Sequence, residues 1–129
     1  MLATVFPDGK PLTSLMAYVF DADAFWMASG PGRKVDNILA EPRVSLLLDT
    51  RERGEDPVRA LTVAARCELV RGPQAAQALA RLRRAHPRLE AFLAAPDVAA
   101  LRARAESYLL LSADGDAEFL PLGGGDAAE

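Results

Sequence analysis

Short apolar runs separated by turn-forming residues make up most of the first third of the chain. Three such runs cover residues 2–6, 11–20 and 24–28. The first two are separated by Pro7-Asp8-Gly9-Lys10, and the last two by Asp21-Ala22-Asp23. Apolar and β-branched runs bounded by turn residues are typical of strands. We therefore expect a meander of three strands joined by short turns.

Two longer strands are expected in the middle of the chain. Residues 43–49 form a nearly continuous apolar run, which is typical of a buried strand. Residues 60–70 alternate instead, with Cys67 in the apolar set and Arg66 in the other. A period of two indicates a half-buried strand with one face open to solvent or ligand. The charged segment between these strands, residues 50–59, is expected to be a solvated loop.

Helical patterns occupy stretches between and after these strands. The expected helices cover residues 33–40, 72–85, 89–93 and 96–104, and two last strands cover residues 107–112 and 118–120. Pro42 follows the first helix, Pro73 lies at the start of the second, and Pro96 opens the last. A sheet of this many strands closes into a barrel readily, because closure removes exposed edges. We therefore predict a β-rich α+β fold: a six- or seven-stranded antiparallel barrel with peripheral helices.

Composition limits the class of protein. The chain has 129 residues, half of them hydrophobic, which is enough for one domain with a proper core. We assign residues 1–122 to this domain and residues 123–129 to a flexible tail. A net charge of −3 offers nucleic acid no electrostatic footprint, and no apolar run approaches the about 18 residues of a membrane span. Cys67 is the one cysteine, which excludes an internal disulfide and a thiolate metal cluster and suits a reducing cytoplasm.

The clearest candidate chemistry lies in residues 29–42, Ser-Gly-Pro-Gly-Arg-Lys-Val-Asp-Asn-Ile-Leu-Ala-Glu-Pro. This stretch opens a helix through small residues and places Arg33, Lys34 and Asn37 near the opening. The first N–H groups of a helix lack internal partners and lie at the positive end of its dipole. Such a helix start is a seat for an anion, and phosphate is the usual occupant.

The helical arc of about 100° per residue sorts this helix into two faces. The polar face carries Arg33, Lys34 and Asn37, and the opposite, apolar face carries Val35, Ile38 and Leu39. We expect the apolar face to anchor the helix on the core and the polar face to meet the anion. The alternative is that the basic pair only solubilises a short surface helix.

Several segments together resemble one known family. They are Leu2-Ala3-Thr4-Val5, Asp8-Gly9-Lys10-Pro11, Ser14-Leu15-Met16, Arg33-Lys34-x-x-Asn37 and Glu41-Pro42-Arg43-Val44-Ser45-Leu46-Leu47. On these residues the chain resembles the FMN-binding split-barrel family, the pyridoxamine-5′-phosphate-oxidase-like superfamily. The resemblance runs from about residue 2 to residue 70, and more loosely to residue 120. The step His86-Pro87 followed by a helix resembles the branch of this family that is linked to haem utilisation.

The resemblance implies a split barrel and a homodimer that binds two FMN molecules, each in a cleft between the subunits. Arg33 and Lys34 match the family's phosphate-binding pair. Ser29 lies where small hydroxyl residues approach the phosphate or the ribityl chain. The expected site therefore centres on the start of the helix over residues 33–40.

Five further residues take expected roles from the resemblance. Ser14, Leu15 and Met16 match a second-strand segment whose backbone faces the flavin ring. Asn37 matches a frequent polar position whose contact is either structural or to the cofactor. Arg66 lies on the strand that, in relatives, reaches toward the partner's flavin. The resemblance thus implies a cofactor site assembled from several strands.

The chain also departs from the family pattern. Ala28 stands where a threonine often helps to hold phosphate, and Ala65 where glycine is common. The true pyridoxamine phosphate oxidases carry a C-terminal Arg-x-His element, whereas residues 118–129 contain neither arginine nor histidine. We therefore expect a relative of that vitamin B6 enzyme. The alanines leave open a relative that binds the deazaflavin F420 or has lost its ligand.

The expected function is that of an FMN-dependent oxidoreductase with a small-molecule electron donor and acceptor. No residue stands out as a catalytic acid or base, which suits chemistry that resides in the cofactor. A non-catalytic module that holds flavin or haem is the alternative, and turnover of NADH or NADPH would separate the two. His86 precedes a proline at a helix break, far from the flavin motif, and is expected to cap or pack a helix end. A lone histidine makes no zinc site, and without a G-x-S-x-G elbow a hydrolase is not expected.

Overall fold

The computed structural model describes residues 1–54 and 57–122. Its strands are β1 (Leu2–Val5), β2 (Pro11–Ser14), β3 (Val19–Asp21), β4 (Ala24–Ser29), β5 (Arg43–Asp49), β6 (Arg59–Val70), β7 (Ala99–Ser112) and β8 (Ala117–Pro121). Its helices are α1 (Arg33–Ala40), α2 (Gly72–Ala85) and α3 (Glu90–Leu93), with 3₁₀ turns η1 (Arg51–Arg53) and η2 (Pro87–Leu89). The predicted tail, residues 123–129, lies outside the described residues.

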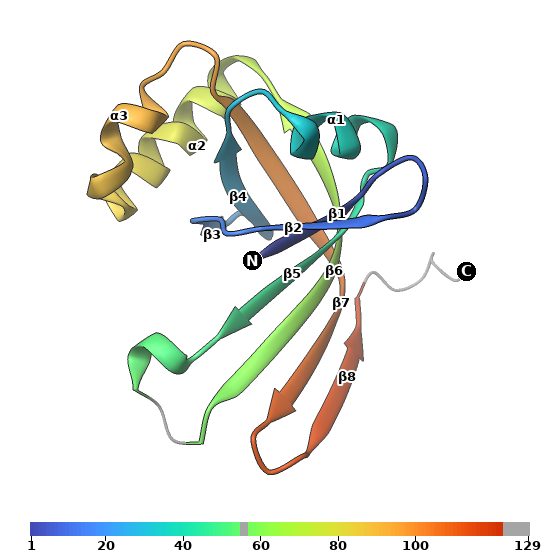
Figure 1. The fold of residues 1–129 in the computed structure, drawn as a ribbon. Helices are drawn as coiled ribbons and strands as arrows, with labels where there is room; N and C mark the ends of the chain where they lie inside the picture. Colours follow the sequence, from blue (N-terminus) through green and yellow to red (C-terminus); the bar gives the residue numbers. More distant parts are fainter. Residues whose placement is uncertain (55–56, 123–129) are drawn as a thin grey trace.

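The strands form one antiparallel sheet that divides along β7. The order is β2-β1-β5-β6-β7-β4-β3, and β8 joins beside β7. Residues 99–103 of β7 pair with β4, and residues 107–111 pair with β8. An upper half therefore curls toward β4 and β3, while a lower half of β5 to β8 extends beyond it (Figure 1). Within the described residues no ladder joins β2 to β3, so the barrel is split and the predicted fold class is confirmed. The sheet has eight strands in these residues, not the six or seven predicted, because residues 11–20 contain two strands, β2 and β3, where one was expected.

A bulge bends β7 where the two halves of the sheet meet. Ala64 of β6 pairs with Ser107, but Ala65 pairs with Ala105, so Glu106 is an extra residue in the ladder. An extra residue on one strand bends that strand and increases its twist. The bulge therefore lies where β7 leaves β4 and reaches β8.

The predicted three-stranded meander is wrong, because residues 11–20 do not form one strand. Leu2, the first residue of β1, pairs with Ser14, so β1 offers no strand partner beyond Ser14. Residues 15–18, here called the β2–β3 link, cross to the opposite end of the sheet, where β3 pairs with β4. The N-terminal strands are therefore two separate hairpins.

The predicted helix over residues 96–104 is also wrong, because Ala99–Ser112 is one long strand, β7. Alanine, leucine and arginine favour helices when considered locally. Here β7 pairs with β6 on one side and with β4 on the other, and both ladders supply its backbone with partners. Tertiary pairing has overridden the local helical propensity.

The inner face of the sheet carries the main core. Leu2, Met27, Val63 and Leu101 are fully buried there, and Ile38 of α1 belongs to the same cluster. The alternation predicted for β6 is confirmed, since its apolar positions from 63 to 67 are buried and the positions between them are exposed. The apolar set of this strand therefore faces the barrel interior.

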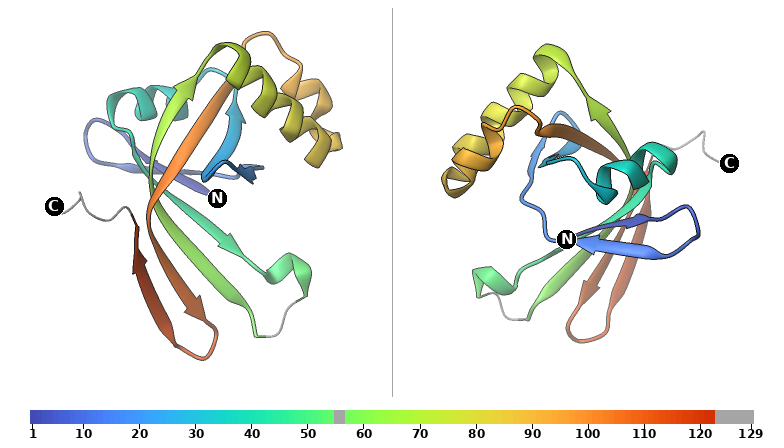
Figure 2. Two further views of the ribbon diagram at one scale, coloured as in Figure 1. Left: turned by 180° about the vertical axis from the view of Figure 1, so that it is seen from behind. Right: turned by 45° about the horizontal axis from the view of Figure 1, so that its top comes forward.

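The α2–α3 lobe, defined as residues 72–93 of α2, η2 and α3, lies on one side of the upper half of the sheet (Figure 2). Ala78 of α2 packs with Ala24 and Trp26 of β4 in a second buried cluster. Leu82 of α2 and Leu93 of α3 pack with Ala28 of β4 in a third. The lobe is thus fixed to β4, the strand that leads to α1.

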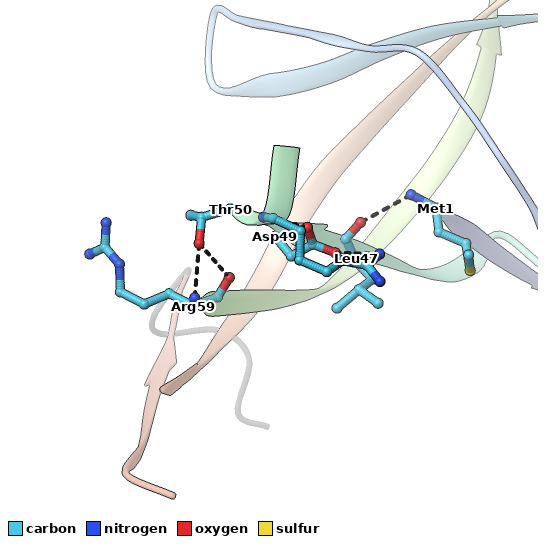
Figure 3. Close-up of polar contacts among 6 residues, drawn as sticks. Met1, Leu47, Asp49, Thr50 and Arg59 are labelled. Atoms are coloured by element: carbon cyan, nitrogen blue, oxygen red, sulfur yellow. Dashed lines mark hydrogen bonds and ion pairs between the residues drawn. The ribbon is translucent and has the colours of Figure 1, made fainter. Parts of the chain in front are cut away.

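Short polar contacts hold the segment between β5 and β6 (Figure 3). The Thr50 hydroxyl accepts a hydrogen bond from the Arg59 backbone N–H at 2.9 Å, and Arg51 pairs with Asp49 at 2.9 Å. The terminal amine of Met1 donates to the Leu47 carbonyl at 3.0 Å. Residues 51–54 and 57–59 are exposed, so the prediction of a solvated loop is confirmed for the part that the structure describes.

Candidate functional site

A cavity of about 530 Å³ lies between the β2–β3 link and the α2–α3 lobe. The link, residues 15–18, forms one wall. The lobe contributes Leu82, His86, Leu89, Phe92 and Leu93, and Ala28, Lys34 and Glu52 also line the cavity. Most of these side chains are apolar, and the charged ones are the cation Lys34 and the carboxylate Glu52. The cavity therefore suits a largely apolar ligand that carries an anionic group.

Lys34 places a half-buried cation in this cavity. Its ammonium donates to the Met16 sulfur at 3.1 Å, and a thioether is a weak acceptor. No carboxylate of the described residues forms an ion pair with it. Burial lowers the pKa of Lys34 below its ordinary value, because desolvation disfavours the charged form. The ammonium therefore has capacity for a much stronger acceptor, such as a phosphate oxygen.

The first turn of α1 adds backbone donors next to Lys34. Gly32 occupies the cap position, and no side-chain hydrogen bond caps the helix. The Asp36 N–H bonds to the Gly32 carbonyl at 3.1 Å, which leaves the N–H groups of residues 33–35 without a helical partner. The helix start therefore places backbone donors and a partial positive charge directly next to Lys34 in the chain, while residues 31–33 themselves do not line the cavity.

The structure brings three of the eight predicted cofactor-binding residues to this cavity. Leu15, Met16 and Lys34 line it. Ser14 is the last residue of β2 and directly precedes the cavity wall. Lys34 and Met16 are 18 positions apart in the sequence, and the fold brings their side chains into contact. The structure thus brings Lys34 of the predicted basic pair, but not Arg33, next to the segment that follows β2.

Three other predicted residues do not line the cavity. Arg33 is exposed at the first position of α1. Ser29 is buried at the end of β4, where its hydroxyl donates to the Gly30 carbonyl at 2.7 Å. Arg66 is exposed on the polar side of β6 and pairs with Glu106, the bulge residue, at 2.9 Å. Their roles in cofactor binding stay predictions.

Asn37 corrects the predicted division of α1 into two faces. It is only 2% exposed, and its amide donates to the Thr4 hydroxyl at 3.1 Å, whereas Leu39, assigned to the buried face, is 67% exposed. The helix is rotated so that Val35, Asn37 and Ile38 face the protein. The Asn37–Thr4 bond therefore pins α1 to β1, and binding of the cofactor by Asn37 stays a prediction.

Replacing Asn37 with alanine should lower the free energy of unfolding by about 2 kcal/mol, because it leaves the buried Thr4 hydroxyl unpaired. Urea denaturation measures the loss. The double variant Thr4→Val, Asn37→Leu removes both polar groups and should recover most of the stability. Equal stability of wild type and Asn37→Ala would contradict a structural role for this bond.

Sequence reasoning missed the second wall of the cavity. His86 was expected to cap or pack a helix end, and it does follow the last residue of α2. Its side chain also lines the cavity, and Nε2 lies 2.9 Å from the Tyr18 carbonyl oxygen. No spacing signal in the sequence connects these residues, because 68 positions separate them.

The remaining candidate groups are structural. Cys67 is buried, and burial raises the pKa of its thiol to about 12, so the prediction of a core thiol is confirmed. Within residues 1–54 and 57–122 no cluster of three histidine, cysteine or acidic side chains could hold a metal ion. In the same residues no helix has the length and apolar character needed to cross a membrane.

A comparison with protein families identifies the chain. The model of the pyridoxamine 5′-phosphate oxidase family matches residues 1–112. The chain therefore belongs to this family, as the resemblance predicted. No curated protein matches the chain.

Solved structures share this fold. A haem-binding protein from Mycobacterium smegmatis is 20% identical to this chain, with a TM-score of 0.81. The matched region covers 93% of this chain and 51% of that protein. The haem storage protein HutZ from Vibrio cholerae is 21% identical with a TM-score of 0.70, covering 81% and 79%. An FAD-binding protein from Mesorhizobium loti is 20% identical with a TM-score of 0.68, covering 84% and 82%. The chain thus spans about half the length of the first of these proteins and shares its fold.

Proposed function

We propose that this protein binds FMN in the cavity beside Lys34 and acts as an FMN-dependent oxidoreductase on a small-molecule donor and acceptor. The observation that carries the proposal is the Lys34 ammonium. It is half-buried in a cavity whose lining is mostly apolar, with Tyr18, Glu52 and His86 as the other titratable side chains, and has a thioether as its hydrogen-bond partner. Membership of the pyridoxamine 5′-phosphate oxidase family supports a flavin as the ligand.

The residues present fit the parts of FMN. Lys34 and the open first turn of α1 would hold the phosphate. The apolar side chains of the α2–α3 lobe suit the face of the ring. The link bears backbone groups that make no backbone–backbone bond outside the ladders, and these could meet the polar edge of the ring. Bound FMN would supply electron-transfer chemistry, while the chain binds and orients it.

The proposal includes a homodimer. A second, apolar cavity of about 500 Å³ lies on the inner face of the lower half of the sheet, between Phe20, Leu61 and Tyr108. Phe119 and Leu120 of β8 are 63% and 55% exposed beside it. A large exposed apolar patch marks an interaction surface, and we assign it to a second copy of the chain. Sedimentation equilibrium of the purified protein checks the mass.

The proposal is tested by titrating the protein with FMN and with riboflavin, which lacks the phosphate. Quenching of flavin fluorescence should give a Kd for FMN at least about tenfold lower than that for riboflavin, as expected for a charged contact. Absence of FMN binding, or equal affinity for both flavins, would refute the phosphate site. Reduction of the bound flavin by NADH or NADPH, with transfer to an acceptor, separates an enzyme from a binding module.

Haem is the second candidate, because the cavity is apolar and contains an imidazole, His86. Two of the proteins that share the fold are described as haem-binding or haem storage proteins. A parallel titration with hemin, followed by its Soret band, decides between the two ligands. Binding of hemin without FMN would replace the flavin proposal, and F420 is tested in the same way.

We also propose a cytoplasmic location for the protein. Its one cysteine, Cys67, is a free, buried thiol, which suits a reducing compartment.

A further inference from the structure

One contact joins the two walls of the cavity directly. His86 Nε2 lies 2.9 Å from the carbonyl oxygen of Tyr18, the last residue of the β2–β3 link. A carbonyl oxygen only accepts, so Nε2 carries the proton and donates. His86 follows the last turn of α2, where its own N–H bonds to the Leu82 carbonyl and Pro87 begins η2. The donor is therefore held by the lobe.

The β2–β3 link is held by side-chain contacts of Met16 with the main core and with Lys34, and of Tyr18 with Phe25, but its backbone has little support. No backbone–backbone bond outside the strand ladders involves residues 15–18 within the described chain. His86 is the side chain that bonds to their backbone, and Leu15 is 89% exposed. A segment whose backbone makes few hydrogen bonds opens at lower free energy than the ladders beside it unless another element holds it. The His86 bond therefore lies where the link needs an anchor.

A second contact joins α2 to the β3–β4 hairpin, at the turn and not at the link. Arg81 of α2 pairs with Asp21 at 2.5 Å, at the turn between β3 and β4. The Trp26 indole N–H donates to the Asp21 carbonyl at 3.1 Å in the same turn. Arg81 therefore holds the far end of β3, and His86 holds the end that enters the cavity.

We propose that His86 is a positioning residue, whose hydrogen bond to the Tyr18 carbonyl holds the β2–β3 link against the α2–α3 lobe. The bond sets the separation of the two cavity walls. Where this concerns the ligand it rests on the proposed function, because the flavin ring would lie between those walls. The hold on the link itself does not depend on any ligand.

Limited proteolysis of the ligand-free protein tests the hold. His86→Leu removes the donor, and His86→Gln supplies an amide N–H in its place. Chymotrypsin cleavage within the link, after Leu15, Met16 or Tyr18, should be at least about tenfold faster in His86→Leu and near the wild-type rate in His86→Gln. Arg81→Leu is the matched control, since it breaks the α2 contact at the turn and should leave cleavage of the link unchanged. Denaturant unfolding of each variant reports any general loss of stability.

Unchanged cleavage of the link in His86→Leu, or equal acceleration in Arg81→Leu, would overturn the role of His86. The ligand part is read from flavin affinity. His86→Leu should weaken FMN and riboflavin by the same factor, about tenfold, because the ring and not the phosphate is displaced. A loss confined to FMN would overturn this part. If wild-type protein binds no flavin, the proposed function fails, and the proteolysis comparison alone decides whether His86 holds the link.

Discussion

Replacing Lys34 with methionine should weaken FMN binding about 100-fold and leave riboflavin binding within about twofold. Methionine keeps an unbranched apolar side chain in the cavity wall but lacks the ammonium. A charged hydrogen bond contributes about 1.5–3 kcal/mol, and each 1.4 kcal/mol is a tenfold change in Kd. The loss should fall on FMN because the two flavins differ in the phosphate. Fluorescence titration of both flavins measures it.

Arg33→Met is the matched control for this experiment. Arg33 precedes Lys34 in α1 but is exposed, so solvent screens its charge and the expected loss of FMN affinity is less than about tenfold. A larger loss from Arg33→Met than from Lys34→Met would place the phosphate outside the cavity. Equal losses for FMN and riboflavin in Lys34→Met would show that the residue supports the ring or the fold, and the phosphate assignment would be wrong.

The lowered pKa of Lys34 also gives FMN binding a pH dependence of defined sign. Phosphate is attracted by the ammonium and not by the neutral amine, so affinity should fall as the pH rises through the lowered pKa. The ligand-free protein should respond in the opposite direction. Its unfolded state binds the Lys34 proton more tightly, so the free energy of unfolding rises between the lowered pKa and the ordinary lysine value. Both trends should be absent in Lys34→Met.

The elements that the sequence predicts best are those with local signals at both ends. The predicted bounds of α1 and β5 agree with the structure, because Pro42 lies between them and cannot continue the helix. The start of α2 at Gly72-Pro73 is likewise a local signal. The bounds of an element could therefore be predicted from the sequence where proline or glycine interrupts a hydrophobic pattern.

The rotation of a helix about its axis and the pairing of strands were harder to predict from the sequence. The rotation of α1 depends on Thr4, a buried hydroxyl on another element that accepts from Asn37. Without that partner, amide and basic side chains share one polar face on a helical wheel. The N-terminal half of β7 depends in the same way on β4 and β6, its neighbours in the sheet. In both cases a contact distant in sequence decided what a local pattern left open.

The residues of the candidate site likewise fall into a set predicted from the sequence and a set that only the structure reveals. Leu15, Met16 and Lys34 were found from the sequence, because short motifs carry them. The wall formed by the α2–α3 lobe was not found, since its apolar residues read as an ordinary helix stripe. Only the packing of the lobe on β4 turns that stripe toward the link. A motif therefore indicated the charged end of the cavity, and tertiary structure supplied its apolar side.

Leu101→Ala should produce the largest loss of stability, about 3 kcal/mol. Leu101 is fully buried in the main core, between Met27 on β4 and Leu69 on β6. Leucine-to-alanine changes in such positions cost about 2–5 kcal/mol, through lost burial and the cavity left behind. Leu111→Ala on the same strand is the matched control, since Leu111 is 38% exposed and should lose less than about 1 kcal/mol. Denaturant unfolding of both variants measures the difference, and similar losses would place the core elsewhere.

The same variant connects the core with the cavity. Leu101 supports β4 through its ladder with Met27, and the next residue of β4, Ala28, lines the cavity. A ligand that binds only the folded state adds stability of RT ln(1 + [L]/Kd), about 2.7 kcal/mol at 100 times Kd. FMN at that concentration should therefore restore most of the stability lost in Leu101→Ala, while riboflavin at the same concentration restores less. Equal recovery with both flavins would contradict recognition of the phosphate by the folded chain.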